Sequence, residues 1–147
     1  MHFKVKKFKE LSVDELYDLL RLREQIFVVE QSCIYVDADG VDKKSIHVLG
    51  LVKNKIVAYA RVIPEGVTYS TPSIGRVVVA EKHRGKKYAY DLMDVAIEVA
   101  RKKLDAKKIT ISAQVYLKEF YKSIGFKPIG KPYLEDGLPH VKMICKV

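Results

Sequence analysis

The chain has 147 residues and a net charge of +9, from 27 lysines and arginines against 18 aspartates and glutamates. This length fits one domain, residues 1–147, that can bury a substantial core, and apolar and charged fractions of 48% and 31% exclude a disordered chain. Apolar runs such as Val77–Ala80 are far shorter than the roughly 20 residues of a membrane span.

Alternating apolar and polar residues indicate strands, and apolar residues three or four positions apart indicate helices. In chain order, these patterns predict a strand over Phe3–Phe8, a helix from Ser12 to about Val29, an irregular segment over Glu30–Asp42, strands over His47–Val52, Lys55–Ile63 and Ile74–Ala80, a helix over Tyr88–Lys103, a strand over Ile109–Ala113, a short helix over Leu117–Ser123, and strands over Phe126–Ile129 and His140–Val147 with a loop over Pro132–Pro139 between them. Early strands pair as hairpins and later strands alternate with helices, so we expect an α+β fold with a mixed α/β sheet.

The N-terminus and the cysteines predict a protein of a reducing compartment that has no metal site. Met1–Val5 lacks the apolar core of a signal peptide, so we expect a cytoplasmic protein. Cys33 and Cys145 make neither a zinc site nor a disulfide framework, and we expect free thiols. Asp37–Gly40 looks like the start of a calcium loop, but Val48 stands where the bidentate glutamate belongs. We therefore expect no metal site.

The excess of positive charge suits a polyanionic partner, which could be nucleic acid, an anionic surface or a phosphorylated cofactor. Lysines scattered over solvated faces account equally well for most of the basic residues. A nucleic-acid-binding module is the weaker interpretation, because aromatic residues are not interleaved with the basic ones and no helix-turn-helix or RNP pattern is present.

The segment from Val77 to Met93 predicts a strand, a basic turn containing Gly85, and a helix. Amides at a helix N-terminus lack partners within the helix, and together with the helix dipole they form an anion site. Gly85 lets the backbone approach a phosphate, and Arg84 adds positive charge. The residues alone also fit an ordinary strand-to-helix connection with solvated lysines.

This segment resembles the acetyl-CoA signature of the GNAT superfamily of N-acetyltransferases, which reads Arg/Gln-x-x-Gly-x-Gly/Ala. Arg84, Tyr88 and Ala89 match it, and Lys87 stands where the family has its middle glycine. Downstream, Gln114 to Phe126 is similar to the family's Asn-x-x-Ala-x-x-x-Tyr-x-x-x-Gly-Phe, with Gln114 in place of asparagine. Two motifs in the right order and spacing are more specific than either alone.

The resemblance extends over roughly residues 10 to 145 and is to the ElaA-like branch of that superfamily. It is carried by five further segments: Leu22–Gln31, Tyr35–Asp42, His47, Ile74–Val79 and Glu135–His140. It implies a mostly antiparallel sheet, flanked by helices, in which two parallel strands, Ile74–Ala80 and Ile109–Ala113, splay apart to admit the pantetheine arm of acetyl-CoA.

The resemblance also implies the reaction and the residues that bind the co-substrate. An amine of a small molecule or peptide would attack the thioester directly while both substrates are bound, and the Val79 amide would stabilise the oxyanion. A homodimer is left open. The expected contacts with acetyl-CoA come from Val77, Val78, Val79, Arg84, Gly85, Lys86, Lys87, Tyr88, Ala89, Gln114 and Tyr121.

Three residues are candidates for the proton transfers that the reaction needs. Tyr121 holds the family's general-acid position, and on its own residues it also fits a core aromatic of a short helix. Glu30 and His140 are the candidate bases, although His140 could instead be a strand-start histidine bonded to the Glu135–Asp136 loop. A water chain could also take the proton.

Two further features stay open from the sequence. The acidic residues of Glu30–Asp42 could attract a cationic amine, or they could form a solvated loop that offsets nearby lysines. Cys33 would permit an acyl-cysteine route, although no base lies beside it in the sequence.

A domain of the same fold that binds acyl-CoA without turnover is the alternative to an enzyme, and Tyr121 argues for catalysis.

Overall fold

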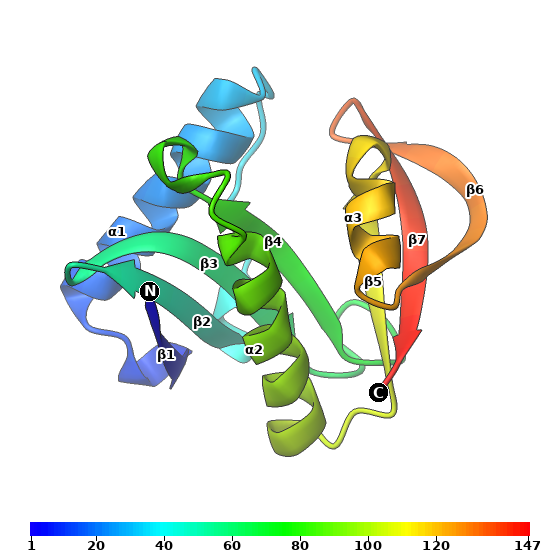
Figure 1. Cartoon of the computed structure of the whole chain (residues 1–147), viewed down its shortest axis with the longest axis horizontal. Coiled ribbons are helices and arrows are strands. Elements are labelled where there is room, and N and C mark those ends of the chain that lie inside the picture. The colour runs from blue at the N-terminus through cyan, green and yellow to red at the C-terminus, as the bar shows by residue number, and fades with distance from the viewer.

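A single seven-stranded sheet with the order β1-β2-β3-β4-β5-β7-β6 runs through the computed structural model, which describes residues 1–147 (Figure 1). The strands are β1 (His2–Lys7), β2 (Ile46–Val52), β3 (Lys55–Ile63), β4 (Ser73–Val79), β5 (Lys108–Gln114), β6 (Lys127–Glu135) and β7 (Leu138–Lys146). The helices are α1 (Val13–Arg23), α2 (Tyr88–Lys103) and α3 (Lys118–Ser123). Neighbouring strands are antiparallel except β4 and β5, which confirms the predicted mixed, mostly antiparallel sheet.

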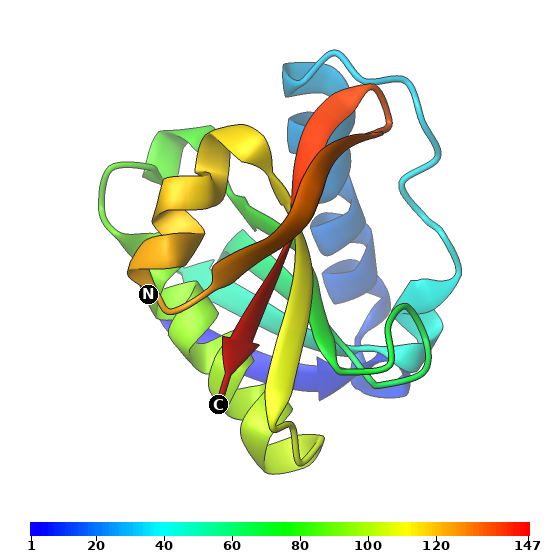
Figure 2. The same ribbon diagram turned by 90° about the vertical axis from the view of Figure 1, so that its right-hand side faces the viewer.

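Helices cover both faces of the sheet, and alternate residues of β3 divide the core between them. Ala58, Ala60 and Val62 belong to the larger apolar cluster, which includes the buried face of α2 and Tyr121 of α3. Tyr59 points the opposite way and packs with Leu19 of α1. Figure 2 shows α1 and α3 on opposite sides of the sheet. No helix is both long and apolar enough to cross a membrane.

A β-bulge in β4 separates it from β5. Tyr59 pairs with Val78 and Arg61 pairs with Gly75, so β4 has one residue more than β3 between these pairs. Arg76, within the bulge, has a φ of 49°. The parallel pairing of β4 with β5 is limited to Ser73 and Thr110, and beyond it the two strands diverge, as Figure 1 shows. The predicted splay is therefore confirmed.

Helix α1 continues into a π-helical segment, Glu24–Glu30, so the helical region ends within one residue of the predicted Val29. Its N-terminus has the predicted capping box between Ser12 and Glu15. A π-helix of this length is rare, and such turns are frequent at functional sites. The sequence pattern predicts a continuous α-helix here and does not reveal the change of geometry.

The predicted loop over Pro132–Pro139 is wrong, because β6 and β7 form a long hairpin. Only Asp136 and Gly137 turn between the strands, with φ of 50° and 77°. An Asp-Gly pair with two positive φ angles is the favoured two-residue hairpin turn.

The wrongly predicted loop begins at Pro132, which lies inside β6. Proline lacks the amide that an inner strand needs, which argues against a strand. However, β6 is the outer strand of the sheet and pairs only with β7. The pairing is also irregular between Ile129 and Tyr133, where Pro132 lies. An edge strand tolerates proline because one side of it has no partner.

Candidate active site

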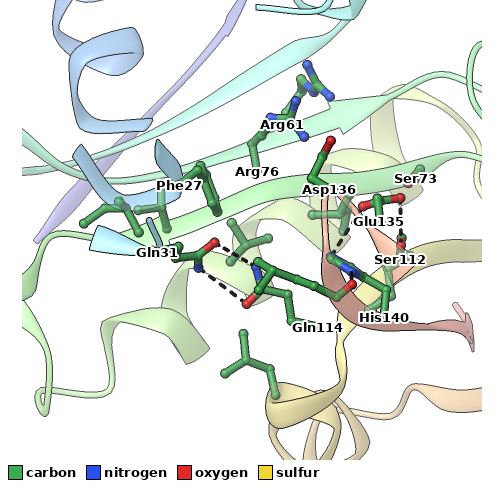
Figure 3. Close-up of a pocket in the computed structure, with 18 of the residues that line it drawn as sticks. Phe27, Gln31, Arg61, Ser73, Arg76, Ser112, Gln114, Glu135, Asp136 and His140 are labelled. Carbon is green, nitrogen blue, oxygen red and sulfur yellow. Dashed lines mark hydrogen bonds and ion pairs between the residues drawn. The ribbon is translucent and has the colours of Figure 1, made fainter. Parts of the chain in front are cut away.

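A cavity of about 850 Å³ lies where β4 and β5 diverge, and Figure 3 looks into it. Its walls come from the end of α1 and the following loop, from β3, β4 and β5, from α3, and from the β6–β7 turn. The predicted site residues that line it are Glu30, Val77, Val78, Val79, Arg84, Ala89, Gln114, Tyr121 and His140. The remaining predicted residues lie outside the lining: Gly85, Lys86 and Lys87 are on the adjoining turn, and Tyr88 begins α2.

The turn between β4 and α2 has the backbone of an anion site. Gly85 and Lys87 have φ of 78° and 62°, and no side chain caps the N-terminus of α2. The first amides of α2 are therefore free to bind an anion, and Lys82 and Lys86 add positive charge nearby. Lys87 adopts the left-handed conformation that glycine adopts without strain, and it occupies the position where the family motif has glycine.

Arg84 and Glu30, predicted for different roles, form an ion pair with each other. The Arg84 Nη1 and Nη2 atoms lie 3.1 and 2.9 Å from the two carboxylate oxygens of Glu30. The Nε of Arg84 donates to the carbonyl of Val79 at 3.1 Å. The pair thus joins the π-helical segment after α1 to the turn before α2, and both residues line the cavity.

Gln114 is held by Gln31, a residue that the site prediction does not include. The two side-chain amides exchange hydrogen bonds at 3.4 and 3.1 Å. Figure 3 shows this pair between the end of α1 and the end of β5. The only signal in the sequence is that Gln31 closes the Leu22–Gln31 segment similar to the family, directly after Glu30.

Tyr121 is at once a core aromatic and a residue of the cavity. It is 7% exposed and packs edge-to-face on Phe120 and Phe126, with ring centroids 5.1 and 6.0 Å apart. Burial raises the pKa of Tyr121 well above its ordinary value, and the nearby Tyr116 raises it further. The phenol therefore keeps its proton at neutral pH, as a general acid requires.

His140 is buried beside the hairpin turn, and both of its ring nitrogens face oxygen atoms. Nδ1 lies 2.8 Å from the carbonyl of Leu138, and Nε2 lies 3.4 Å from Oε2 of Glu135. The ring stacks on Tyr133, with centroids 6.2 Å apart. The contact with Glu135 agrees with the histidine placed against the Glu135–Asp136 segment, and His140 also lines the cavity. Its role as a base stays a prediction.

A family model for the acetyltransferase (GNAT) domain matches residues 26–147. The chain belongs to the GNAT acetyltransferase family. It is 42% identical to the protein ElaA of Escherichia coli over 94% of this chain and 92% of that protein. A UPF0039 protein of Schizosaccharomyces pombe is 43% identical over 97% of this chain and 95% of its own length. The predicted likeness to the ElaA branch is confirmed.

Two solved structures have the same fold as this chain. The crystal structure of Escherichia coli ElaA has a TM-score of 0.91 and 39% identity, covering 99% of this chain and 100% of that one. An acyl-CoA N-acyltransferase from Pseudomonas aeruginosa also has a TM-score of 0.91, with 34% identity and 99% of each chain covered. The predicted GNAT-like acyl-CoA N-acyltransferase fold is therefore confirmed.

The acidic segment of this GNAT chain is neither a free cation attractor nor a solvated loop, which corrects both predicted interpretations. Its three aspartates pair with three arginines of α1, β3 and β4: Arg23 with Asp37 and Asp42, Arg61 with Asp39 and Asp42, and Arg76 with Asp37 and Asp39. Burial alone would raise the pKa of Asp42, but the hydrogen bond and the charge of Arg23 lower it. The network therefore has no net charge.

Cys33 links the loop after α1 to the β6–β7 turn of the GNAT domain. Its Sγ donates to the carbonyl of Asp136 at 3.1 Å, and the side chain lines the cavity. Its hydrogen-bond partner is a backbone carbonyl, which cannot take a proton from the thiol. The geometry gives no support to an acyl-cysteine route through Cys33.

Proposed function

We propose that this protein is an N-acetyltransferase that transfers an acetyl group from acetyl-CoA to a primary amine of a small molecule or peptide, with both substrates bound together. The observation that carries the proposal is the cavity between the splayed strands β4 and β5, which holds a buried, protonated Tyr121. Membership in the GNAT family supports acyl transfer as the reaction class. Acetyl as the acyl group, the amine class and a cytoplasmic location stay predictions.

The residues around the cavity fit the parts of acetyl-CoA. The uncapped N-terminus of α2 and the guanidinium of Arg84 suit a pyrophosphate. The backbone of Val77–Val79 lines the cavity beside the gap and suits the amides of the pantetheine arm. When bound, the thioester supplies an activated acetyl carbon. Because Glu30 holds Arg84 in the free protein, pyrophosphate binding has to displace or share this contact.

Tyr121 is the proposed general acid. Its hydroxyl takes part in none of the side-chain hydrogen bonds of the protein, and it donates its proton to the departing sulfur in the proposed reaction. The neutral phenol suits a position beside the apolar core before the transfer. Proton donation leaves a phenolate, which then regains a proton from solvent through the open cavity.

His140 is better supported than Glu30 as the proposed base. Both carboxylate oxygens of Glu30 bind the guanidinium of Arg84, at the pyrophosphate end of the cavity. In His140, Nδ1 donates to the Leu138 carbonyl, so in the neutral ring Nε2 has a lone pair that can accept a proton from an amine.

The proposed reaction is tested by measuring release of the CoA thiol from acetyl-CoA over a library of primary amines. We expect amine-dependent release together with formation of the acetylated amine, which mass spectrometry detects. Acetyl-CoA binding without turnover on any amine would contradict catalysis and favour the acyl-CoA-binding domain instead. Salt-dependent binding to random DNA without acetyl-CoA binding would favour the nucleic-acid module.

For the general acid, we expect Tyr121→Phe to lower kcat by about a hundredfold or more, because general acid catalysis contributes roughly 10²–10⁴-fold. The affinity for acetyl-CoA should change little, since the ring and its packing remain. Tyr17→Phe is the matched control, because Tyr17 is an exposed residue of α1 and does not line the cavity. Unchanged turnover in Tyr121→Phe would remove this residue from the mechanism.

A further inference from the structure

We propose that Glu135 binds the ammonium group of the acceptor and that, with His140, it directs the loss of the ammonium proton, so the site selects cationic over zwitterionic amines. This inference rests on the proposed acetyl transfer and names the residue and the charge class that the acceptor end recognises. Glu135 lines the cavity at the end of β6.

The carboxylates of the cavity differ in whether a basic side chain neutralises them. Glu30 is bound by Arg84, and Asp39 is bound by Arg61 and Arg76. Glu135 and Asp136, on the β6–β7 hairpin, form no ion pair with lysine or arginine. The uncompensated charge of the cavity is therefore negative and lies at this hairpin, although the whole chain carries a net charge of +9.

Glu135 and His140 together make a place for an N–H donor. Oε2 of Glu135 lies 3.4 Å from Nε2 of His140, and the Nδ1 proton of His140 is directed to the Leu138 carbonyl. In the neutral imidazole, Nε2 is an acceptor that faces a carboxylate, which is also an acceptor. An ammonium group beside both atoms would donate one hydrogen bond to each, whereas the neutral ring and the carboxylate have no proton to share with each other at this contact.

Neighbouring side chains hold Glu135 in this position. The hydroxyl of Ser112, on β5, donates to Oε1 of Glu135 at 3.3 Å and is also bonded to the hydroxyl of Tyr133. The Tyr133 ring stacks on the His140 ring. Figure 3 shows Ser112, Glu135 and His140 together at the hairpin side of the cavity. The carboxylate is thus fixed by residues of three strands, β5, β6 and β7.

The proton transfer at this pair is simple. The ammonium donates one hydrogen bond to Glu135 and one to Nε2 of His140. Nε2 then takes that proton as the N–H bond breaks, which leaves a neutral amine with a lone pair and an imidazolium beside the Glu135 carboxylate. The carboxylate stabilises the imidazolium until the proton leaves to solvent.

The same arrangement disfavours an acceptor that carries its own carboxylate. The three arginines that line the cavity, Arg61, Arg76 and Arg84, are each held by carboxylates of the protein. A carboxylate on the acceptor would find no free guanidinium and would be repelled by Glu135 and Asp136. A second positive charge on the acceptor would instead be attracted to them.

The test compares three amines of similar length that differ in their far end: 1,3-diaminopropane, propylamine and β-alanine. With saturating acetyl-CoA, kcat/KM of the wild type should be highest for the diamine and lowest for β-alanine, with at least about a tenfold span. Glu135→Gln should raise the KM for the diamine by about tenfold, because hydrogen bonds to charged groups are stronger than neutral ones. It should also reduce the difference in kcat/KM between the diamine and β-alanine. The KM for acetyl-CoA should stay unchanged.

Glu119→Gln is the matched control, because it removes the same charge from the exposed face of α3, outside the cavity, and should change none of these values. Preference of the wild type for β-alanine would overturn the inference. An unchanged KM for the diamine in Glu135→Gln would also overturn it, while leaving acetyl transfer itself intact. Failure of the wild type to acetylate any amine would instead overturn the proposed function on which the inference rests.

Discussion

Lys87 adopts a conformation that is costly for its residue type. With φ of 62° it forms the N-cap of α2 in the left-handed region, which costs a non-glycine residue roughly 1–2 kcal/mol. The GNAT motif has glycine at this position, and the sequence alone shows only the departure from the motif. The backbone of the turn has nevertheless kept the geometry that a glycine would adopt. The lysine side chain is exposed and adds charge beside the proposed pyrophosphate site.

We expect Lys87→Gly to raise the free energy of unfolding by about 0.5–1 kcal/mol, because relief of the left-handed strain outweighs the greater freedom of glycine in the unfolded chain. Lys86→Gly is the control, since it removes the same charge at a neighbouring position without a positive φ and should not stabilise the protein. Urea unfolding of both variants measures the difference. A lower free energy of unfolding for Lys87→Gly than for the wild type would contradict the proposed strain at Lys87.

His47 is a buried histidine inside the arginine–aspartate network. Its Nδ1 accepts from the hydroxyl of Tyr59 at 2.7 Å, and its Nε2 donates to the carbonyl of Asp42 at 2.9 Å. Burial lowers the pKa of His47, and the hydrogen bond and the charge of Asp42 offset this only in part. The native state therefore holds His47 neutral at pH values where the unfolded chain binds a proton.

The stability of the protein should fall as the pH drops below about 6.5, because from there down to the lowered pKa of His47 the unfolded state binds one more proton than the native state. The lowered pKa values of Asp39 and Asp42 act only at more acidic pH, below about 4. Urea unfolding between pH 5 and 7 should show a smaller slope for His47→Gln than for the exposed control His2→Gln. Equal pH dependence of the free energy of unfolding in the two variants would exclude His47 as the cause of the loss of stability.

At the scale of elements, the sequence predicts the helices and most strands well but misses what connects them. Amphipathic spacing and motif matches are sufficient to place α2, α3 and the residues Tyr121 and Arg84. The pairing of Arg84 with Glu30 and of Gln114 with Gln31 depends on how the end of α1 approaches β4 and β5. No local pattern encodes such contacts between distant segments, and the π-helical turn that creates them has no sequence signature.

The contact between the end of α1 and the turn before α2 pairs Glu30 with Arg84, and we propose that Glu30 acts through this pair and not as the base. We expect Glu30→Gln to retain kcat within about twofold and to bind acetyl-CoA a few-fold more tightly, because an exposed ion pair is worth roughly 0–1 kcal/mol and no longer competes for the guanidinium. Calorimetric titration and steady-state kinetics measure both. A large loss of kcat with unchanged affinity would instead establish Glu30 as a base.

At the scale of the whole molecule, the bulge in β4 and the single parallel pairing of Ser73 with Thr110 create the cavity. The sequence implied this splay only through the likeness to the GNAT family, because no spacing of Ile74–Ala80 or Ile109–Ala113 indicates that the strands diverge. The sequence also did not predict which carboxylates of the cavity stay without a basic partner. All four acids of Glu30–Asp42 pair with arginines, and the unpaired carboxylates of the cavity lie on a hairpin where the sequence predicted a loop.

The central claim is that acetyl-CoA binds in the gap between β4 and β5. Thermal unfolding with and without acetyl-CoA tests it most directly, since a ligand at about 100 times its Kd stabilises the native state by about 2.7 kcal/mol. For a chain of this size, the melting temperature should rise by about 5–10 °C. An unchanged melting temperature at millimolar acetyl-CoA would contradict the account.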